Sequence, residues 1–379
     1  MLVIELPYGR VPYLLDLGDR RATVVSAPEC ASPPPLPPLL TAALDAPIGR
    51  PRIEQLVRAS ARVTVIISDA TRTEPRAAFL EHLRARLPAV AWTIAVATGT
   101  HGPTSLADLE LPPHLVRDAR IVNHDGRSEL VSLGATSRGT PVELHRCLLE
   151  ADLVVATGCI RPHYFAGFGA GVKAIFPGLG SIPSIRRNHE LKTHPGARAG
   201  NVLDNPCRAD LEEAVSLLPT PTFLINGVCG PDDLVHAAVA GDPVAAFRAG
   251  VDLARPWFTV RAPRAPLVIA SDALPVTASL YQAAKIAAAV APLVAEGGTL
   301  LLVAECAGGI GPLEVVNEAI FRIGVLPRLA PSASIALISS LSPAEVSRTL
   351  VAHAPSPAPF LSASPIVVVP RASRLLFEL

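Results

Sequence analysis

Short apolar runs alternate with amphipathic helical patterns along most of this 379-residue chain. The first clear runs cover residues 63–68, 93–97 and 152–156, and a helical pattern opens near Pro75. Such runs, separated by helices, are typical of buried parallel strands, because crossover connections place helices on both faces of the sheet. The alternation therefore predicts an α/β fold built from largely parallel sheets flanked by helices.

A proline-containing stretch at residues 261–266 is interpreted as a linker to a second series of elements. The second series has expected strands at 267–271, 299–304 and 334–339 and expected helices at 279–296, 313–323 and 343–353. A chain of this length commonly forms two or three domains. We therefore predict an N-terminal domain over residues 1–262 and a Rossmann-like C-terminal domain over residues 266–362, with the active site in the cleft between them.

Two further segments have less regular patterns. Residues 366–379 either complete the second series or pack back on the first domain. The proline-rich residues 32–38 are expected to form an extended surface loop, since successive prolines favour extended backbone.

Composition narrows the class of protein. Hydrophobic residues make up 50% of the chain, charged residues 17%, and the formal net charge is zero. A net charge of zero argues against nucleic acid as a partner and against membrane binding through a polybasic patch. The 6 cysteines form no CxxC pair, no signal peptide is recognisable, and the apolar runs are much shorter than the roughly 20 residues of a membrane span. These features favour a soluble cytoplasmic protein with reduced thiols.

The segment at residues 162–178 contains three glycines within five positions, at Gly167, Gly169 and Gly171. Glycines let the backbone approach a bound group closely, so this segment is interpreted as a binding site. His163 and Lys173 flank the glycines, and Lys173 is one of only three lysines in a chain with 33 Lys and Arg residues. Because arginine fills nearly every other basic position, a lysine here indicates that an amine is required. The glycine spacing matches neither a Walker loop nor a dinucleotide fingerprint.

Polar residues follow two of the expected strands, at the edge where open α/β sheets bind ligands. The segment from Asp69 to Pro75 contains Thr71 and Arg72. An Asp or Thr here could simply cap the next helix, whereas Arg72 is suited to bind a carboxylate with two hydrogen bonds. His101 lies in the loop after the second strand, where a histidine is either a surface residue or an acid/base group.

The expected helix at 279–296 begins with Tyr281, Gln282 and Lys285. Gln282 and Lys285 are three residues apart and share a helix face. This face is either a solvated surface or a site that meets a ligand.

The chain resembles the lactate racemase family, whose members use a nickel-pincer nucleotide derived from nicotinic acid. The motifs that carry the resemblance, in chain order, are Leu6-Pro7-Tyr8-Gly9, Asp69-Ala70-Thr71-Arg72-Thr73-Glu74-Pro75, Thr98-Gly99-Thr100-His101, Pro162-His163-Tyr164-Phe165-Ala166-Gly167-Phe168, Lys173, Pro177-Gly178, Asn188-His189, Asn205-Pro206 and Tyr281-Gln282-Ala283-Ala284-Lys285. They span nearly the whole chain in the family's order.

The resemblance implies roles for individual residues. Lys173 matches the lysine that can carry the cofactor through a thioamide bond, and His189 matches the protein ligand to nickel. His101 and His163 match the two acid/base histidines. For catalysis, Arg72 is expected to polarise the substrate, with Asp69 as its orienting partner. The other expected site residues are Thr71, Gly169 and Gly171 for cofactor binding, and Arg72, Tyr281, Gln282 and Lys285 for binding the substrate carboxylate.

The resemblance also implies a reaction. It predicts racemisation or epimerisation of a small 2-hydroxy carboxylic acid by reversible hydride transfer to the nickel-pincer nucleotide, which cofactor-synthesis enzymes would supply. The alternative is a non-catalytic relative that binds a nucleotide or a hydroxy acid. The joint presence of two acid/base histidines with Lys173 and His189 favours the enzyme, because a binding protein does not require acid/base groups.

Overall fold

The computed structural model describes residues 2–378, which divide into two compact units. The larger unit comprises Cys30–Trp257. The smaller unit joins the chain up to Glu29 to the chain from Phe258 onward. Both units combine a mainly parallel sheet with flanking helices, so the predicted α/β class is confirmed.

The larger unit is built on a six-stranded sheet of order β13-β12-β9-β4-β5-β6, in which only β13 is antiparallel to its neighbour. Its strands are β4 (Arg62–Ser68), β5 (Ala91–Ala97), β6 (Ala119–Asn123), β9 (Leu153–Ile160), β12 (Thr222–Cys229) and β13 (Val235–Gly241). The strands expected at residues 63–68, 93–97 and 152–156 are confirmed as β4, β5 and β9.

The order of the strands reverses between β4 and β9. The chain runs outward from β4 to β5 and β6, then returns to place β9 on the other side of β4. In open α/β sheets such a reversal opens a crevice at the carboxyl ends of the strands, where ligands bind. The loops that follow β4, β5 and β9 begin at this edge.

Helices α1 (Leu36–Asp45) and α2 (Arg76–Arg86) pack against one face of this sheet through a shared apolar core. The prediction of a loop at residues 32–38 is therefore wrong from residue 36 onward, because α1 begins at Leu36. Pro37 and Pro38 occupy its first turn, where a missing amide hydrogen costs nothing. The opposite face is covered in part by η4 (Gly171–Ala174) and α6 (Ala245–Phe258). The other α-helices and strands of this unit are α3 (Pro113–Val116), β7 (Leu130–Ala135), β8 (Pro141–His145), β10 (Pro162–His163), β11 (Gly167–Phe168), α4 (Ile182–Glu190) and α5 (Pro206–Ser216).

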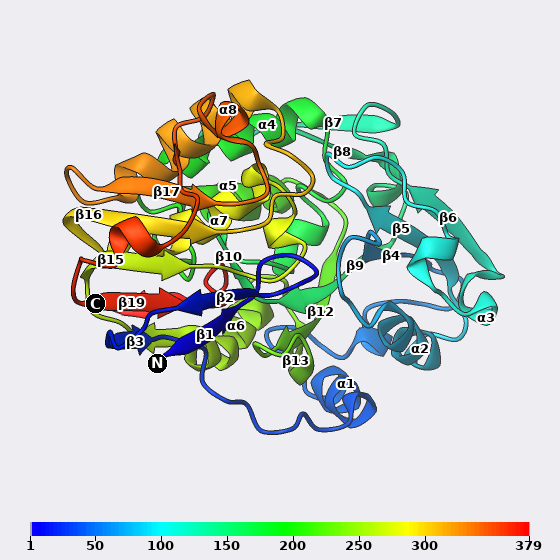
Figure 1. Ribbon diagram of the computed structural model, residues 1–379. Helices are drawn as coiled ribbons and strands as arrows, with labels where there is room; N and C mark the ends of the chain where they lie inside the picture. The colour runs from blue at the N-terminus through cyan, green and yellow to red at the C-terminus, as the bar shows by residue number, and fades with distance from the viewer. Residues whose placement is uncertain (1, 379) are drawn as a thin grey trace. The chain divides into compact units, whose positions relative to one another are not determined.

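The smaller unit contains a second six-stranded sheet, of order β18-β17-β16-β15-β19-β3, and all its neighbours are parallel. Figure 1 shows β17, β16, β15, β19 and β3 stacked in this order. The strands are β3 (Ala22–Val24), β15 (Ala265–Ala270), β16 (Val294–Val303), β17 (Ser334–Ile338), β18 (Ala352–His353) and β19 (Ile366–Val369). A separate pair joins β14 (Thr259–Arg261) to β20 (Leu376–Glu378).

The N-terminal segment belongs to this smaller unit, which differs from the boundary expected at residues 1–262. The hairpin of β1 (Val3–Leu6) and β2 (Tyr13–Asp16) packs Leu6 and Leu15 against the inner strands of the sheet. The edge strand β3 then pairs with β19. Without this hairpin, the apolar face formed by residues such as Ile269 would be left exposed to water.

The C-terminal segment completes the same sheet. β19 (Ile366–Val369) lies between β15 and β3, as expected if this segment completes the second series. The expected linker at 261–266 lies inside this unit, because β14 already pairs with β20.

Helices α7 (Leu280–Val290) and α8 (Pro343–Val346) are shorter than expected. Pro292 stops α7 because it cannot donate an amide hydrogen bond, and the chain enters β16 two residues later. The helix expected at 313–323 is a π-helix over Val315–Val325. No helix within residues 2–378 combines the length and apolarity needed to cross a bilayer.

Candidate active site

Hydrogen bonds to Asp69 and from Arg76 hold the loop after β4 in place. One oxygen of the Asp69 carboxylate, Oδ1, accepts hydrogen bonds from the Thr71 backbone N–H (3.0 Å) and the Thr71 hydroxyl (2.5 Å). Arg76, on the first turn of α2, donates to the carbonyl oxygens of Ser68 (2.8 Å), Asp69 and Arg72 (2.6 Å). The loop that carries Arg72 is thus held at both ends by a buried carboxylate and a largely buried guanidinium.

The other oxygen of Asp69 holds His101. Asp69 Oδ2 lies 2.6 Å from His101 Nδ1, although the two residues follow different strands. The Asp69 side chain is 3% exposed, whereas that of His101 is 46% exposed. A carboxylate that accepts from Nδ1 keeps the hydrogen of the neutral ring on Nδ1, so Nε2 is free of hydrogen and can accept a proton. The sequence predicted both residues, and the structure brings them together.

The environment of Asp69 favours its charged form. Burial by itself raises the pKa of this carboxyl, but the hydrogen bonds from His101 and Thr71 outweigh it, as do the charges of His101 and Arg72. The pKa of Asp69 therefore lies below its usual value. Hydrogen bonds to the ionised form lower a carboxyl pKa in this way.

Replacing Asp69 with asparagine should change both activity and stability. The amide can no longer impose the Nδ1–H form of His101, so kcat should fall by about 10²-fold or more. A carboxyl with a lowered folded-state pKa stabilises the fold above its unfolded pKa of about 3.9, and this contribution is lost as the pH falls. Chemical denaturation from pH 7 to pH 3 should therefore show a flatter stability profile for Asp69→Asn than for the native chain. Identical profiles and an unchanged kcat would contradict the assigned role.

His163 and Lys173 form a second pair beyond β9. His163 lies in a tight hairpin, where β10 pairs with β11 and His163 faces Gly167. The backbone N–H of Ala166 donates to His163 Nδ1 (3.2 Å), so the ring hydrogen of the neutral form lies on Nε2. His163 Nε2 is 3.0 Å from Lys173 Nζ, and an Nε2–H donor requires the amine of Lys173 to be deprotonated.

Burial favours the same deprotonated state. It holds the pKa of Lys173 well below its usual value, and the charges of Arg208 and Arg72 lower it further. A deprotonated amine is a nucleophile, unlike the ammonium form of an exposed lysine.

The ring of Phe165 lies at the centre of the expected cofactor residues. Its centroid is 4.6 Å from the His163 ring, 5.0 Å from the His189 ring and 5.4 Å from Lys173 Nζ. The ring is 4% exposed. Phe165 therefore joins three residues that lie up to 26 positions apart in sequence.

His189 lies in the last turn of α4. Burial lowers its pKa to about 3, with smaller effects from the nearby lysines, so the ring is neutral. Neutral imidazole is the form that binds metals. The preceding residue, Asn188, donates from Nδ2 to the buried Asp210 carboxylate of α5 (2.8 Å), which fixes this end of α4.

Asn205, which caps the N-terminus of α5, and Arg208 on the first turn of this helix support the glycine-rich segment. Asn205 Nδ2 donates to the Phe165 carbonyl (2.7 Å). Arg208, which is fully buried, donates to the carbonyls of Ala166 (3.4 Å) and Phe168, and its guanidinium lies 4.2 Å from the Phe247 ring centroid. The segment is thus held by side chains rather than by a regular sheet.

The structure gives the glycines a different explanation from the one the sequence suggested. Gly171 has a φ of +65°, and a Cβ there would meet Phe247 Cδ2 at 2.7 Å. The amides of Gly169 and Gly171 donate to the Arg161 carbonyl (2.7 Å) and to Asn226 Oδ1 (3.0 Å). The backbone at these glycines therefore lies close to other parts of the protein itself. Cofactor binding by these two glycines and by Thr71 remains a prediction.

Tyr281, Gln282 and Lys285 lie on α7 of the smaller unit. Lys285 Nζ donates to Gln282 Oε1 (2.5 Å), as expected for two residues on one helix face. Tyr281 is 36% exposed. Their predicted contact with the substrate carboxylate remains a prediction.

Sequence reasoning missed Phe165, Arg76 and Arg208. Phe165 could have been noticed, because aromatic residues make up only 4% of the chain and this one lies between His163 and Gly167. Arg208 follows the Asn205-Pro206 motif by two residues, but nothing in that spacing indicates a buried guanidinium. Arg76 looks like any surface residue of an amphipathic helix.

Comparison with known proteins gives consistent matches. The family described as "Lactate racemase N-terminal domain" matches residues 8–200. The lactate racemase of Thermoanaerobacterium thermosaccharolyticum is 31% identical over 349 residues, which cover 85% of this chain and 82% of the relative. That of Lactiplantibacillus plantarum is 30% identical over 325 residues, which cover 82% and 76%.

Solved structures give the same match. The lactate racemase apoprotein from T. thermosaccharolyticum aligns with a TM-score of 0.87 at 26% identity, covering 100% of both chains. A Thermotoga maritima protein shares the fold, with a TM-score of 0.64 at 16% identity over 86% of this chain and 95% of that one.

Proposed function

Because the chain belongs to the lactate racemase family, an isomerase family, we propose that it racemises or epimerises a small 2-hydroxy carboxylic acid with the help of a nickel-pincer nucleotide. The observation that carries the proposal is the presence of two differently partnered histidines in one unit. His101 is held by Asp69, and His163 contacts Lys173. A racemase needs one acid/base group for each enantiomer of its substrate.

The cofactor residues fit this group in their chemistry. Lys173 offers a deprotonated amine, which can form an amide-type bond. His189 offers a neutral imidazole, a ligand suited to nickel. No set of three or more His, Cys, Asp or Glu side chains within residues 2–378 is arranged to hold a metal. One protein ligand is enough for a pincer cofactor, since the cofactor carries the other donor atoms itself.

When bound, the nickel-pincer nucleotide would accept the substrate's α-hydrogen as hydride and return it. The protein's part is to move the hydroxyl proton. For one enantiomer, Nε2 of His101 takes this proton while Asp69 stabilises the resulting imidazolium. His163, whose Nε2 carries the ring hydrogen in the free chain, is the proposed acid/base group for the other enantiomer. Loss of the hydroxyl proton and the α-hydrogen would give the 2-keto acid. The α-hydrogen would then return to the opposite face of the carbonyl carbon, while the other histidine gives a proton to the carbonyl oxygen.

Lys173 also controls His163 in this proposal. In the free chain its amine contacts Nε2 of His163. Acylation of Lys173 removes the basic lone pair from its nitrogen, so the hydrogen on Nε2 of His163 is then available to the substrate oxygen. Arg72, the remaining expected residue of this unit, lies in the loop fixed by Asp69 and Arg76 and is the candidate to bind the substrate carboxylate.

The function is tested by coexpression with cofactor-synthesis enzymes, followed by chiral analysis of D- and L-lactate and other 2-hydroxy acids. The loaded protein should interconvert the enantiomers of at least one such acid and should contain nickel. His189→Ala should lose most of the nickel while keeping its circular dichroism spectrum, because one protein ligand is removed. His194→Ala, a nearby histidine with no assigned role, is the matched control and should keep nickel. Binding of cofactor or hydroxy acid without interconversion would instead favour the non-catalytic alternative.

A further inference from the structure

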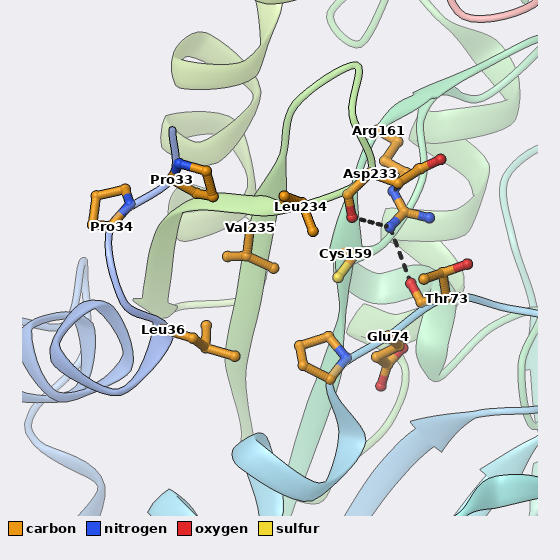
Figure 2. Close-up of a pocket in the computed structure, with 11 residues that line it drawn as sticks. Pro33, Pro34, Leu36, Thr73, Glu74, Cys159, Arg161, Asp233, Leu234 and Val235 are labelled. Atoms are coloured by element: carbon orange, nitrogen blue, oxygen red, sulfur yellow. Dashed lines mark hydrogen bonds and ion pairs between the residues drawn. The ribbon is translucent and has the colours of Figure 1, made fainter. Parts of the chain in front are cut away.

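Arg161 is the first residue after β9 and lies two positions before His163. Its side chain is 17% exposed and lines a cavity of about 360 Å³ in the larger unit. Figure 2 shows Leu36 and two prolines on one side of this cavity, and the Arg161 guanidinium beside Thr73 and Asp233 on the other. The proposed reaction assigns no role to this guanidinium.

The Arg161 side chain is anchored to the turn between β12 and β13. Its Nε lies 3.4 Å from Asp233 Oδ1, and its Nη2 lies 3.4 Å from the Asp233 carbonyl oxygen. Two backbone hydrogen bonds close the turn itself, from Gly230 N–H to the Leu234 oxygen (3.0 Å) and from Asp233 N–H to the Gly230 oxygen (3.1 Å). The guanidinium is therefore attached to a hydrogen-bonded turn.

From this anchor, the Arg161 side chain holds the loop that carries Arg72. Its Nη2 donates to the Thr73 carbonyl oxygen (3.0 Å), one residue beyond Arg72. Arg76 donates to the carbonyl oxygen of Arg72 itself (2.6 Å). Two arginines from different parts of the chain thus hold consecutive carbonyl oxygens, so the position of Arg72 depends on both of them.

The main chain of Arg161 holds the hairpin that carries His163. The Arg161 carbonyl oxygen accepts a hydrogen bond from the Gly169 N–H (2.7 Å), which extends the pairing of β10 with β11 by one step. His163 lies on β10, and η4 with Lys173 follows this hairpin in the chain. A single residue therefore joins the loop of Arg72 to the hairpin of His163.

We propose that Arg161 is a positioning residue, which sets the spacing between Arg72 and His163. The proposal rests on the proposed function, in which Arg72 binds the substrate carboxylate and His163 exchanges a proton with the neighbouring oxygen. The carboxylate carbon of a 2-hydroxy acid is bonded directly to the carbon that carries this oxygen, so covalent bonds restrict the separation of the two groups. Catalytic groups have to match such a separation to within about 0.5 Å. Arg161 supplies a link between the two loops that the pairing of the strands does not provide.

The loop of Arg72 has a second attachment that keeps it folded when Arg161 is replaced. Glu74 Oε1 accepts from the Thr157 hydroxyl of β9 (2.8 Å), and Glu74 Oε2 accepts from the Ser68 hydroxyl of β4. These bonds fix the loop to the sheet but not to the His163 hairpin. Loss of the Arg161 guanidinium should therefore loosen the loop without unfolding it.

The first test measures amide hydrogen exchange in the unloaded protein. Arg161→Ala should speed exchange in a peptide covering residues 69–76, whereas a peptide covering β5 should keep its native rate. Arg120→Ala is the matched control and should change neither peptide. Arg120 is also ion-paired, to Glu150 at 2.6 Å, but it lies near the amino end of β6, away from the loops of the candidate site.

This measurement separates the proposal from the proposed function. Unchanged exchange over residues 69–76 in Arg161→Ala would overturn the proposal, whatever reaction the native protein performs. Faster exchange confined to this loop supports the link even if the native protein racemises none of the acids tested, a result that would count against the proposed function alone.

The second test measures racemisation by the loaded protein, with rates expressed per bound nickel so that a smaller folded fraction does not count. Arg161→Ala should lower kcat by about 10²-fold, because a displacement of about 1 Å can cost a reaction that factor. KM should change much less, since Arg72 itself remains to bind the carboxylate. Arg120→Ala should keep the native kcat.

Chemical rescue then distinguishes the hydrogen-bonding fork of Arg161 from its charge. Ethylguanidinium replaces the atoms that Arg161→Ala removes, and the adjoining cavity gives it a route to the vacant position. It should raise the kcat of Arg161→Ala at least about tenfold. Ethylammonium carries the charge without the planar fork and should not. The proposal is overturned if nickel-loaded Arg161→Ala keeps the native kcat, or if ethylguanidinium restores the rate no better than ethylammonium.

Discussion

Replacing either His101 or His163 with alanine is expected to abolish racemisation in both directions. Each turnover uses one histidine to remove the hydroxyl proton and the other to return it. Loss of either group therefore stops both the D-to-L and the L-to-D reaction. General acid–base groups typically contribute about 10²–10⁴-fold, so the racemisation rate should fall by at least this factor. Chiral chromatography, started from each pure enantiomer, measures both directions.

Nickel and cofactor contents serve as the control for these variants. Both should stay near the native values, because neither histidine is proposed as a metal ligand. His114→Ala supplies a matched control, since His114 is an exposed histidine on α3 of the same unit. A variant at His101 or His163 that still racemises at more than a tenth of the native rate would remove that residue from the mechanism.

Replacing Lys173 is expected to eliminate covalent attachment of the cofactor. Intact-mass analysis of protein coexpressed with the cofactor-synthesis enzymes should show one adduct on the native chain and none on Lys173→Ala. Lys173→Arg keeps a long nitrogen-bearing side chain but cannot form the bond, because guanidinium is not deprotonated in proteins. It should therefore also lack the adduct.

The remaining two lysines are the internal control for this assignment. Lys192→Arg and Lys285→Arg should both keep the adduct. An unchanged adduct on Lys173→Ala, or an adduct that maps to Lys192 or Lys285, would contradict the proposed role of Lys173. Racemisation by the native protein with no adduct at all would show that the cofactor is held without a covalent bond.

The sequence predicted the parts of the fold that depend on local pattern. The apolar runs that became β4, β5 and β9 are buried on both faces, so composition alone marks them. The position of the N-terminal hairpin could not be predicted. Its residues Leu6 and Leu15 meet a sheet formed more than 250 positions later, and a short alternating pattern does not identify its partner.

For the candidate site, too, the sequence predicted some features and not others. The sequence indicated which chemical groups follow each strand, because ligand sites form at the carboxyl ends of parallel strands. It did not indicate that Asp69 would hold His101, or that His163 would contact Lys173. These contacts depend on the strand order in the sheet and on side chains such as Arg208, which is buried despite its charge.

The measurement that tests the proposed reaction most directly follows the α-hydrogen of the substrate. The loaded enzyme is given enantiomerically pure lactate carrying deuterium at Cα in ordinary water, and the product is analysed by mass spectrometry and chiral chromatography. Hydride return predicts that deuterium is retained at the inverted carbon, because the α-hydrogen never meets solvent. Removal of the α-hydrogen as a proton would instead let it exchange with water. Washout of the deuterium into solvent at the rate of inversion would therefore contradict the account.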